Sequence, residues 1–293
     1  MAQTNILSAP HSVLLKRSER LIGAILVDGG RLSAEGVERI LHLQHERGLR
    51  FGEAGKALRL LSQADIDYAL ARQFDYPYLL GAEGKLNRHV VAAYDPFGPR
   101  VEALRALRNQ LMLRWADADV ARKALAIISP ARQEGRSFIA ANLAVLFSQL
   151  GERTLLIDGD MRSPAQHELF GIENRIGLSA MLSGRGSADA LLRIPGLMRL
   201  TVLPAGAQPP NPLELLSRPA FSNLLQDLAA DYDSILVDTP PAGQYADAQT
   251  IASRAGAALI VARRNISRIS QIRSIADALG DAGTKVVGTV LNR

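Results

Sequence analysis

Short apolar runs alternate with amphipathic stretches from Lys123 to the end of the chain. Runs of this length, bounded by polar and glycine-containing turns, predict strands, whereas the stretches between them carry apolar residues at helical spacing. Because the strands are apolar on both faces and helices separate them, the pattern predicts a doubly wound, mainly parallel α/β sheet. The predicted strands are 124–128, 154–157, 200–203, 234–237, 257–261 and 286–291.

The front of the chain has a different, helical pattern. The stretch 22–44 aligns without a gap with the stretch 51–73, and each copy reads as a helix, a turn and a longer helix. Ser33 and Ser62 stand at the turn of each copy, where a side-chain oxygen can satisfy free N–H groups at the start of a helix. The repeat therefore predicts two helical hairpins that form a small all-α domain.

The change of pattern divides the chain into four parts. Residues 1–19 are polar and without a pattern, which predicts a flexible lead. The all-α domain is expected over 20–80. A linker is expected over 81–99, because this stretch contains Gly-Ala-Glu-Gly and a turn-rich Asp-Pro-Phe-Gly-Pro sequence. The α/β domain then follows over 100–293, with a helix expected at its start.

Composition excludes several classes of protein. The 293 residues include no cysteine, which excludes disulfides and thiolate metal sites and favours a cytosolic protein. The net charge is +5, but no dense basic run and only one Trp are present, which argues against nucleic-acid binding. No apolar run approaches the roughly 20 residues that cross a bilayer. We therefore expect a soluble protein that reaches a membrane only through a partner.

The first chemical motif follows the strand that ends at Ile128. A phosphate-binding loop needs inward backbone N–H groups, a cation on the phosphates and a hydroxyl on Mg²⁺. Gly135 permits the tight turn, Arg136 supplies the cation and Ser137 supplies the hydroxyl. The following helix directs its positive end at the phosphates. The nucleotide-binding residues predicted here are Gln133, Glu134, Gly135, Arg136, Ser137 and Phe138.

This loop departs from the usual pattern at two positions. Pro130 stands where the first glycine is usual, and Arg136 replaces the usual lysine. An arginine keeps the charge but presents a planar fork rather than a compact donor. By itself the segment is also compatible with an ordinary strand–loop–helix connection.

Two further motifs follow predicted strands. The segment Leu-Leu-Ile-Asp-Gly-Asp-Met-Arg contains Asp158 and Asp160 and ends at Arg162. Its two carboxylates can therefore face one phosphate site. One can hold Mg²⁺ and the other can accept a proton from an incoming hydroxyl. A later apolar strand ends in Asp238, the arrangement in which a Walker B carboxylate reaches the Mg²⁺ shell. Together the three motifs predict ATP and Mg²⁺ binding.

The set of motifs resembles the bacterial tyrosine kinases (BY-kinases) of capsule and exopolysaccharide systems. The resemblance covers about residues 94–293 and includes Asn211-Pro-Leu-Glu-Leu-Leu and the closing Gly-Thr-Val-Leu-Asn. It implies that Asp158 and Asp160 are the catalytic pair, without dividing base and metal duties between them. It further implies that Arg136 neutralises charge. Mg²⁺ would be held by Ser137, Asp160 and Asp238, and ATP would also contact Arg162 and Asn292.

The same resemblance bears on assembly. Glu102, Arg105 and Arg108 match the E-x-x-R-x-x-R motif that joins BY-kinase subunits into a ring, and their spacing places them along one helix. The residues alone would equally suit a solvated, salt-bridged helix face. The family resemblance favours a homo-oligomer.

The helical repeat resembles the N-terminal domain of type II secretion ATPases, some of which bind cyclic di-GMP. Arg50, before Phe51 and Gly52, could stack on a guanine, but the corresponding position in the first copy is Leu21. A docking or structural module is the alternative. The whole architecture resembles the EpsG-type chain-length determinant tyrosine kinases. It implies a cytoplasmic protein, peripheral to the inner membrane, whose partner is the cytosolic segment of a membrane-anchored polysaccharide chain-length regulator.

One feature of the BY-kinases is missing. They usually end in a tyrosine cluster, whereas this sequence ends at Arg293 and its six tyrosines are dispersed. The acceptor could lie elsewhere in the chain or in another protein. Two alternatives to a kinase stay open: a nucleotide-dependent regulator of the exporter that only hydrolyses ATP, and a cyclic di-GMP-sensing adaptor.

Overall fold

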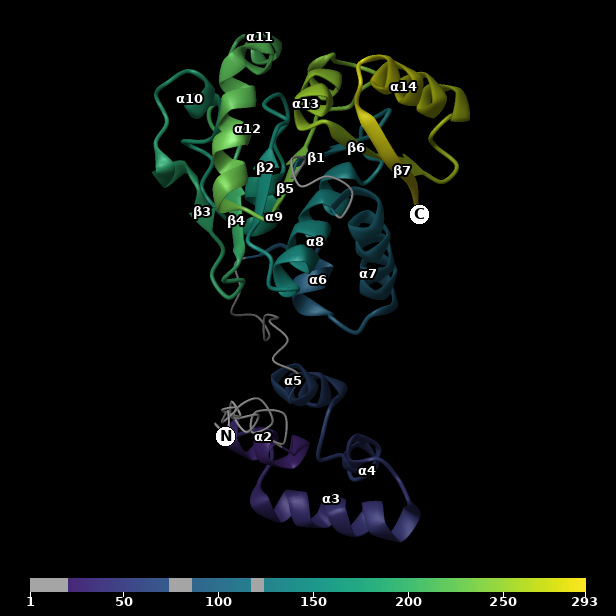
Figure 1. Cartoon of the computed structure of the whole chain (residues 1–293). Helices are drawn as coiled ribbons and strands as arrows, with labels where there is room; N and C mark the ends of the chain where they lie inside the picture. The colour runs from purple at the N-terminus through teal and green to yellow at the C-terminus, as the bar shows by residue number, and fades with distance from the viewer. Residues whose placement is uncertain (1–20, 74–85, 117–123) are drawn as a thin grey trace, which may run out of the picture. The chain divides into compact units, whose positions relative to one another are not determined.

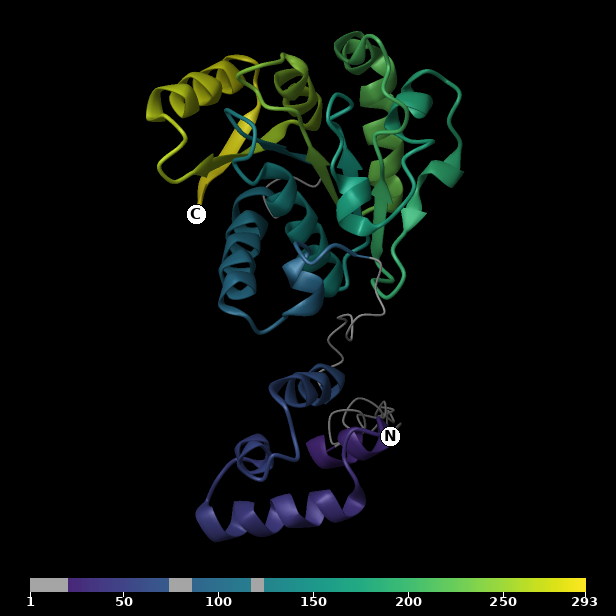
Figure 2. The same cartoon turned by 180° about the vertical axis from the view of Figure 1, so that it is seen from behind.

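The structure, a computed structural model, describes residues 21–73, 86–116 and 124–293. Contacts divide the chain into two compact units, Met1–Pro77 and Tyr78–Arg293, which Figures 1 and 2 show from opposite sides. Among the helices of the described ranges, none is long and apolar enough to cross a membrane. The predicted lead, 1–19, lies outside the described residues.

In its described part, the front unit contains four helices that follow the sequence repeat. Gly23 and Gly52 are equivalent in the two copies. A Cβ at Gly23 would lie 3.2 Å from Val37, and one at Gly52 would lie 3.0 Å from Ile66, the residue equivalent to Val37. The same close helix contact therefore recurs in both hairpins. The helices are α2 (Ile22–Asp28), α3 (Ala34–Arg47), α4 (Phe51–Ala57) and α5 (Gln63–Gln73).

The two predicted N-caps of this unit are confirmed. The Ser33 hydroxyl accepts a hydrogen bond from the Gly36 amide at 3.0 Å. The Ser62 hydroxyl accepts one from the Asp65 amide at 3.2 Å. Both serines thus satisfy a backbone donor that the first turn of a helix leaves free.

Replacing Ser33 by Ala is expected to weaken α3 by about 1 kcal/mol, because the Gly36 amide loses its acceptor. Hydrogen exchange of the intact chain, followed by mass spectrometry, measures this as faster exchange at the start of α3. Ser33→Thr is the control, since it keeps a hydroxyl at the cap. Equal exchange in the Ala and Thr variants would contradict the assignment of the cap.

The structure differs from the predicted linker. Residues 86–98 belong to the second unit, and α6 (Val91–Tyr94) packs on its core. The Asn142 side chain accepts a hydrogen bond from the Ala92 amide at 2.9 Å, and the Gln149 side chain donates one to the Ala92 carbonyl at 3.0 Å. These bonds come from a distant helix, so a local pattern of turn residues could not indicate them. The earlier part of the predicted linker, 81–85, lies outside the described residues.

The second unit is built on a seven-stranded sheet of order β3-β4-β2-β5-β1-β6-β7. All six predicted strands are confirmed, and these six are parallel to one another. The one strand not predicted, β3, has two residues and pairs antiparallel with β4 at the edge. The strands are β1 (Ala124–Ile128), β2 (Thr154–Asp158), β3 (Leu192–Arg193), β4 (Leu200–Leu203), β5 (Ser234–Asp238), β6 (Ala257–Arg263) and β7 (Lys285–Asn292).

Helices cover both faces of this sheet, which confirms the doubly wound fold. In β1, Leu125 and Ile127 join the core beneath one set of helices, whereas Ala126 and Ile128 join the core beneath the other. Figure 1 shows the two layers on opposite sides of the strands. The first layer is α6, α7 (Pro99–Leu111) and α8 (Arg136–Gln149); the second is α10 (Leu178–Leu182), α11 (Pro212–Ser217), α12 (Pro219–Asp231), α13 (Asp247–Ala255) and α14 (Ile269–Asp281).

The strand order determines where the polar motifs meet. β5 lies between β1 and β2, and all three are parallel. In the sheet register, Asp238 at the end of β5 pairs with Asp158 on β2 and with Ile127 on β1. The loops after these three strands therefore leave the same edge of the sheet side by side, which is where doubly wound folds bind ligands.

Candidate functional site

The predicted phosphate-binding loop connects β1 to α8 in a tight turn. Gln133 and Gly135 both have left-handed backbone conformations, with φ of 61° and 91°. The Asn292 side chain occupies the space beside Gly135: its amide donates to the Glu134 carbonyl at 3.0 Å, and a Cβ at Gly135 would lie 2.0 Å from that nitrogen. Only glycine suits this position. The structure thus brings Asn292, from the last strand, directly onto the loop.

Two residues that the sequence did not indicate hold this loop, one from the end of β6 and one from the turn between β6 and α14. Arg263 donates to the Gln133 carbonyl at 2.8 Å. The Ser267 hydroxyl donates to the Glu134 carboxylate, which is buried and also accepts the Ala131 amide at 2.7 Å. Glu134 therefore acts as an internal brace of the loop, and its side chain is not free to contact a ligand.

We expect Gln133→Gly to stabilise the protein by about 0.5–1 kcal/mol. A left-handed conformation costs a side-chain-bearing residue about 1–2 kcal/mol, and glycine loses about 0.5–1 kcal/mol through the greater freedom of its unfolded chain. Urea unfolding measures the difference. The control is Gln226→Gly, an exposed position within α12, where glycine should destabilise by about 1 kcal/mol. A loss of stability in Gln133→Gly would show that the loop conformation carries no strain.

Arg136, at the start of α8, joins the three motifs. Its Nε donates to Asp238 Oδ1 at 3.0 Å, its Nη1 to the Ser129 hydroxyl at 3.0 Å and its Nη2 to Asp160 Oδ2 at 3.3 Å. The side chain is 9% exposed. A planar guanidinium can serve three acceptors in this way, whereas a lysine ammonium is a point donor. The cation expected at the phosphates is thus paired with the site's own carboxylates.

Asp158 is buried at the end of β2. Its carboxylate accepts three backbone amides: Asp160 at 3.2 Å, Ala165 at 3.0 Å and Gln166 at 2.9 Å. Burial, and next the charge of Asp238, raise the pKa of Asp158 well above its usual range, although the amides act against this shift. Asp158 therefore both shapes the loop and has a strong affinity for a proton.

Asp160 directly follows Gly159 and is 3% exposed. Its Oδ1 accepts the Arg162 amide at 3.1 Å and the Ser163 amide at 2.9 Å, while Oδ2 faces Arg136. Burial raises the pKa of Asp160, and the Arg136 cation opposes that shift. The glycine between the two carboxylates is required, because a Cβ at Gly159 would lie 2.6 Å from the Asp238 carbonyl.

The donor set suits a hard divalent cation. Asp160, Asp238 and the half-buried Ser137 would supply oxygen ligands, which Mg²⁺ prefers. No group of three or more His, Cys, Asp or Glu side chains in the described ranges could hold a metal ion alone. This fits Mg²⁺, which usually keeps several waters and is shared with substrate phosphates. The buried side-chain oxygen of Gln166 beside Asp238 also has no hydrogen-bond partner within the described part of the chain.

Two other residues predicted to contact the nucleotide, Arg162 and Phe138, have side chains that make contacts outside the phosphate-binding loop. The Arg162 guanidinium donates to the Asp247 carboxylate at 3.1 and 3.3 Å and lies 4.2 Å from the centre of the Tyr245 ring. The Phe138 side chain is half-buried and packs against the core beneath α8. Arg132, in the first motif, was not predicted as a site residue. At the surface its side chain donates hydrogen bonds to Ser163 at 3.0 Å and Gln244 at 3.3 Å, which follow the second and third motifs along the chain.

The predicted assembly motif is divided between surface and interior. Arg105 is bonded to Glu102 at 3.1 Å, and the Glu102 side chain is 71% exposed. Arg108 is buried and donates to the Leu146 carbonyl of α8 at 3.1 Å. Within this unit Arg108 therefore anchors α7 to α8, Glu102 is the outward part of the motif, and Arg105 is half-buried beside it.

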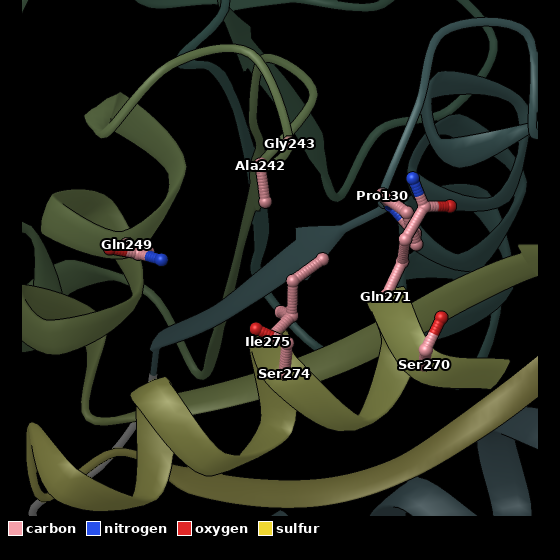
Figure 3. A pocket seen from close by; sticks show the side chains of 8 residues that line it. All are labelled: Pro130, Ala242, Gly243, Gln249, Ser270, Gln271, Ser274 and Ile275. Carbon is pink, nitrogen blue, oxygen red and sulfur yellow. The ribbon is translucent and has the colours of Figure 1, made fainter. Parts of the chain in front are cut away.

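A cavity of about 290 Å³ lies beside the phosphate-binding loop but is separate from the carboxylates. Figure 3 shows Gln271 and Ile275 of α14 facing Pro130 and Ala242 across it. Pro130 is its single contribution from the predicted loop. The lining residues are Pro130, Ala242, Gly243, Gln249, Ser270, Gln271, Ser274 and Ile275.

Arg50, the predicted ligand contact of the front unit, precedes α4. Its backbone amide donates to the Glu53 carboxylate at 2.9 Å, and the residue is exposed. Elsewhere in this unit, Arg31 lies 4.5 Å from the centre of the Tyr68 ring and pairs with Asp65 at 2.7 Å. These contacts account for a helix cap and for packing within the unit. Comparisons with known proteins do not support cyclic di-GMP binding.

Comparisons with known proteins agree with this geometry. The family described as the CobQ/CobB/MinD/ParA nucleotide binding domain matches residues 125–293. The chain is 35% identical over 192 residues to a putative tyrosine-protein kinase, CapB, of Staphylococcus aureus, covering 66% of this chain and 83% of that protein.

Solved structures give the same picture. The crystal structure of the chimerical protein CapA2B2 has a TM-score of 0.66 and 33% identity, covering 76% of this chain and 97% of that one. The septum site-determining protein MinD of Pyrococcus horikoshii, complexed with Mg-ADP, has a TM-score of 0.52 and 25% identity, covering 58% and 70%. The predicted doubly wound, nucleotide-binding α/β fold is therefore confirmed, and it is the fold of MinD-type domains.

Proposed function

The chain belongs to the bacterial tyrosine-protein kinases with a CobQ/CobB/MinD/ParA-type domain, and from this premise we propose that it transfers the γ-phosphoryl group of Mg·ATP to tyrosine. The observation that carries the proposal is the convergence of three motifs on one guanidinium. Arg136 contacts Asp160 at 3.3 Å and Asp238 at 3.0 Å. These carboxylates come from different strands and meet at the edge of the sheet where ligands bind.

The site would act mainly by positioning and by neutralising charge, as phosphoryl transfer requires. Backbone N–H groups of the loop before α8 bind the phosphates, and Arg136 leaves the carboxylates to contact them. Ser137, Asp160 and Asp238 would hold Mg²⁺, which supplies charge neutralisation when it is bound. Asp158 and Asp160, as a pair, orient the tyrosine hydroxyl and take up its proton. Asn292 would contact the base side of the nucleotide.

Two further parts of the proposal concern assembly. We place the exposed Glu102 of α7, together with the half-buried Arg105 that it pairs with, in contacts between copies of the chain. We also propose that the cytosolic segment of a membrane-anchored polysaccharide chain-length regulator docks on the protein and holds it at the inner membrane. Light scattering tests the first part: Glu102→Ala should lower the oligomer mass, with Glu173→Ala, away from α7, as the control.

The central experiment incubates the purified chain with γ-labelled ATP and Mg²⁺, with and without the partner's cytosolic segment. Mass spectrometry then looks for phosphotyrosine in the chain, in the partner segment and in an added tyrosine-containing protein. Phosphotyrosine in any of them supports a kinase. Label that appears only as free phosphate, under all conditions, would show a nucleotide-hydrolysing regulator instead.

A further inference from the structure

Gln166 is a buried residue that neither the sequence motifs nor the proposed catalytic roles use. It is the first residue of α9 (Gln166–Phe170) and is 0% exposed. It lies eight residues after Asp158, in a stretch that has no recognisable motif. Its side chain nevertheless points into the site, because it contacts the carboxylate of Asp238.

Three hydrogen bonds tie Gln166 to all three motifs. Its backbone amide donates to Asp158 Oδ2 at 2.9 Å. Its side-chain Nε2 donates to Asp238 Oδ2 at 2.7 Å and to the backbone carbonyl of Ser137 at 3.2 Å. Because both Nε2 bonds go to oxygen acceptors, the amide orientation is fixed: the reverse orientation would place Oε1 against two oxygens.

The other end of this amide has no partner. Gln166 Oε1 is buried and accepts no hydrogen bond from the described residues. Buried polar atoms in proteins are nearly always satisfied, and an unsatisfied one often marks the place of a water or an ion. The atom belongs to the same amide whose Nε2 contacts Asp238, a predicted Mg²⁺ ligand, so the unsatisfied acceptor is only one amide group away from that carboxylate.

The two oxygens of Asp238 have different partners. Oδ1 is bonded to Arg136 at 3.0 Å, and Oδ2 is bonded to Gln166 at 2.7 Å. Arg136 has an alternative partner in the phosphates of a nucleotide, whereas Gln166 is held in place by Ser137 and Asp158. If Arg136 moved to the phosphates, Oδ1 would become free while Oδ2 stayed bound to Gln166. The carboxylate would then present one defined oxygen.

We propose that Gln166 is a positioning residue for magnesium: its amide fixes Asp238 through Oδ2 so that Oδ1 can bind the metal, and its free Oε1 accepts a hydrogen bond from a water on that metal. This inference rests on the proposed nucleotide site. Residues that orient a metal ligand in this way commonly change metal affinity tenfold to a hundredfold when they are replaced. Gln166 would therefore determine how tightly Mg²⁺ is held, and not how tightly the nucleotide alone is held.

The test compares Gln166→Leu with Gln149→Leu in the full-length chain. Gln149 is a matched control, because it is also buried and donates its amide to a backbone carbonyl, that of Ala92, away from the carboxylates. Calorimetry measures ADP binding in the presence of EDTA and Mg²⁺ binding to the ADP complex. Gln166→Leu should weaken Mg²⁺ binding about tenfold to a hundredfold and leave ADP binding in EDTA unchanged. Gln149→Leu should change neither.

A second readout separates positioning from simple stability. Kinase activity of Gln166→Leu should be restored by raising the Mg²⁺ concentration, so that the half-saturating concentration rises while kcat at saturation is kept. If Gln166→Leu does not fold, Gln166→Met keeps the length of the side chain and replaces the leucine variant. Wild-type Mg²⁺ affinity in a folded variant would overturn the inference. Absence of nucleotide binding by the wild-type protein would instead overturn the proposed function.

Discussion

Replacing Asp158 by Asn is expected to abolish phosphotyrosine formation and to leave ATP binding largely intact. The amide cannot accept the proton of the attacking hydroxyl, and loss of a general base commonly lowers the rate by about 10²–10⁴-fold. ATP affinity should change little, because in the proposed site the loop before α8, and not Asp158, would bind the phosphates. Phosphotyrosine is measured by mass spectrometry and ATP binding by calorimetry.

The control for this variant is Asp233→Asn. Asp233 is paired with Arg153 at 2.8 Å, before β5 and therefore at the opposite end of that strand from the site. Its replacement should leave transfer at the wild-type rate. Phosphotyrosine from Asp158→Asn at the wild-type level would contradict the catalytic assignment of the pair.

Stability provides a second measurement on the same variant. Since burial raises the pKa of Asp158 in the folded state, the folded protein keeps its proton over a pH interval in which the unfolded chain releases it. The free energy of unfolding should therefore fall as the pH rises from the usual aspartate range through this interval. Asp158→Asn should flatten that dependence. An equally steep fall in the variant would place the titration elsewhere.

Arg136→Ala is expected to have the second large effect. Its three hydrogen bonds to Asp238, Asp160 and Ser129 are lost, and so is the cation for the phosphates. A hydrogen bond to a charged group contributes about 1.5–3 kcal/mol, so ATP affinity should fall roughly tenfold to a hundredfold and transfer should fall further. Calorimetry with Mg·ATP measures the first loss, and phosphotyrosine formation measures the second.

Two further variants test whether the loss of ATP affinity is specific to the Arg136 guanidinium. Arg153→Ala removes an exposed arginine whose partner is Asp233, and should leave ATP binding unchanged. Arg136→Lys keeps the charge but cannot reach three acceptors at once. It should retain a larger share of ATP affinity than the alanine variant. ATP affinity in Arg136→Ala equal to the wild type would show that the cation is not part of the phosphate site.

The sequence was sufficient for the sheet and for the carboxylates. Six strands could be predicted because parallel strands are apolar along their whole length, and Asp158 and Asp238 stand directly after two of them. Polar residues at the carboxyl ends of neighbouring strands must meet. The short edge strand β3 was not predicted, because two residues are too few to show a pattern of apolar and polar positions.

The supports of the site could not be predicted in this way. Gln166 meets Asp238 across 72 residues, Arg263 meets Gln133 across 130, and Ser267 meets Glu134 across 133. No local pattern marks such partners, since each depends on the angle at which a loop leaves its strand. The burial of Arg108 also depends on tertiary packing. Helical spacing alone could not distinguish Arg108 from its exposed neighbours.

The contacts of Arg136 have a thermodynamic consequence. In the structure Arg136 and Asp238 form an ion pair, so that at the proposed site phosphate and metal would each compete with an internal counter-ion. A nucleotide that draws Arg136 away also releases Asp238 for Mg²⁺, and Mg²⁺ on Asp238 releases Arg136 for the phosphates. Because such linkage is reciprocal, each ligand should tighten the other by the same factor. The protein would then bind nucleotide and Mg²⁺ together more tightly than it binds either component alone.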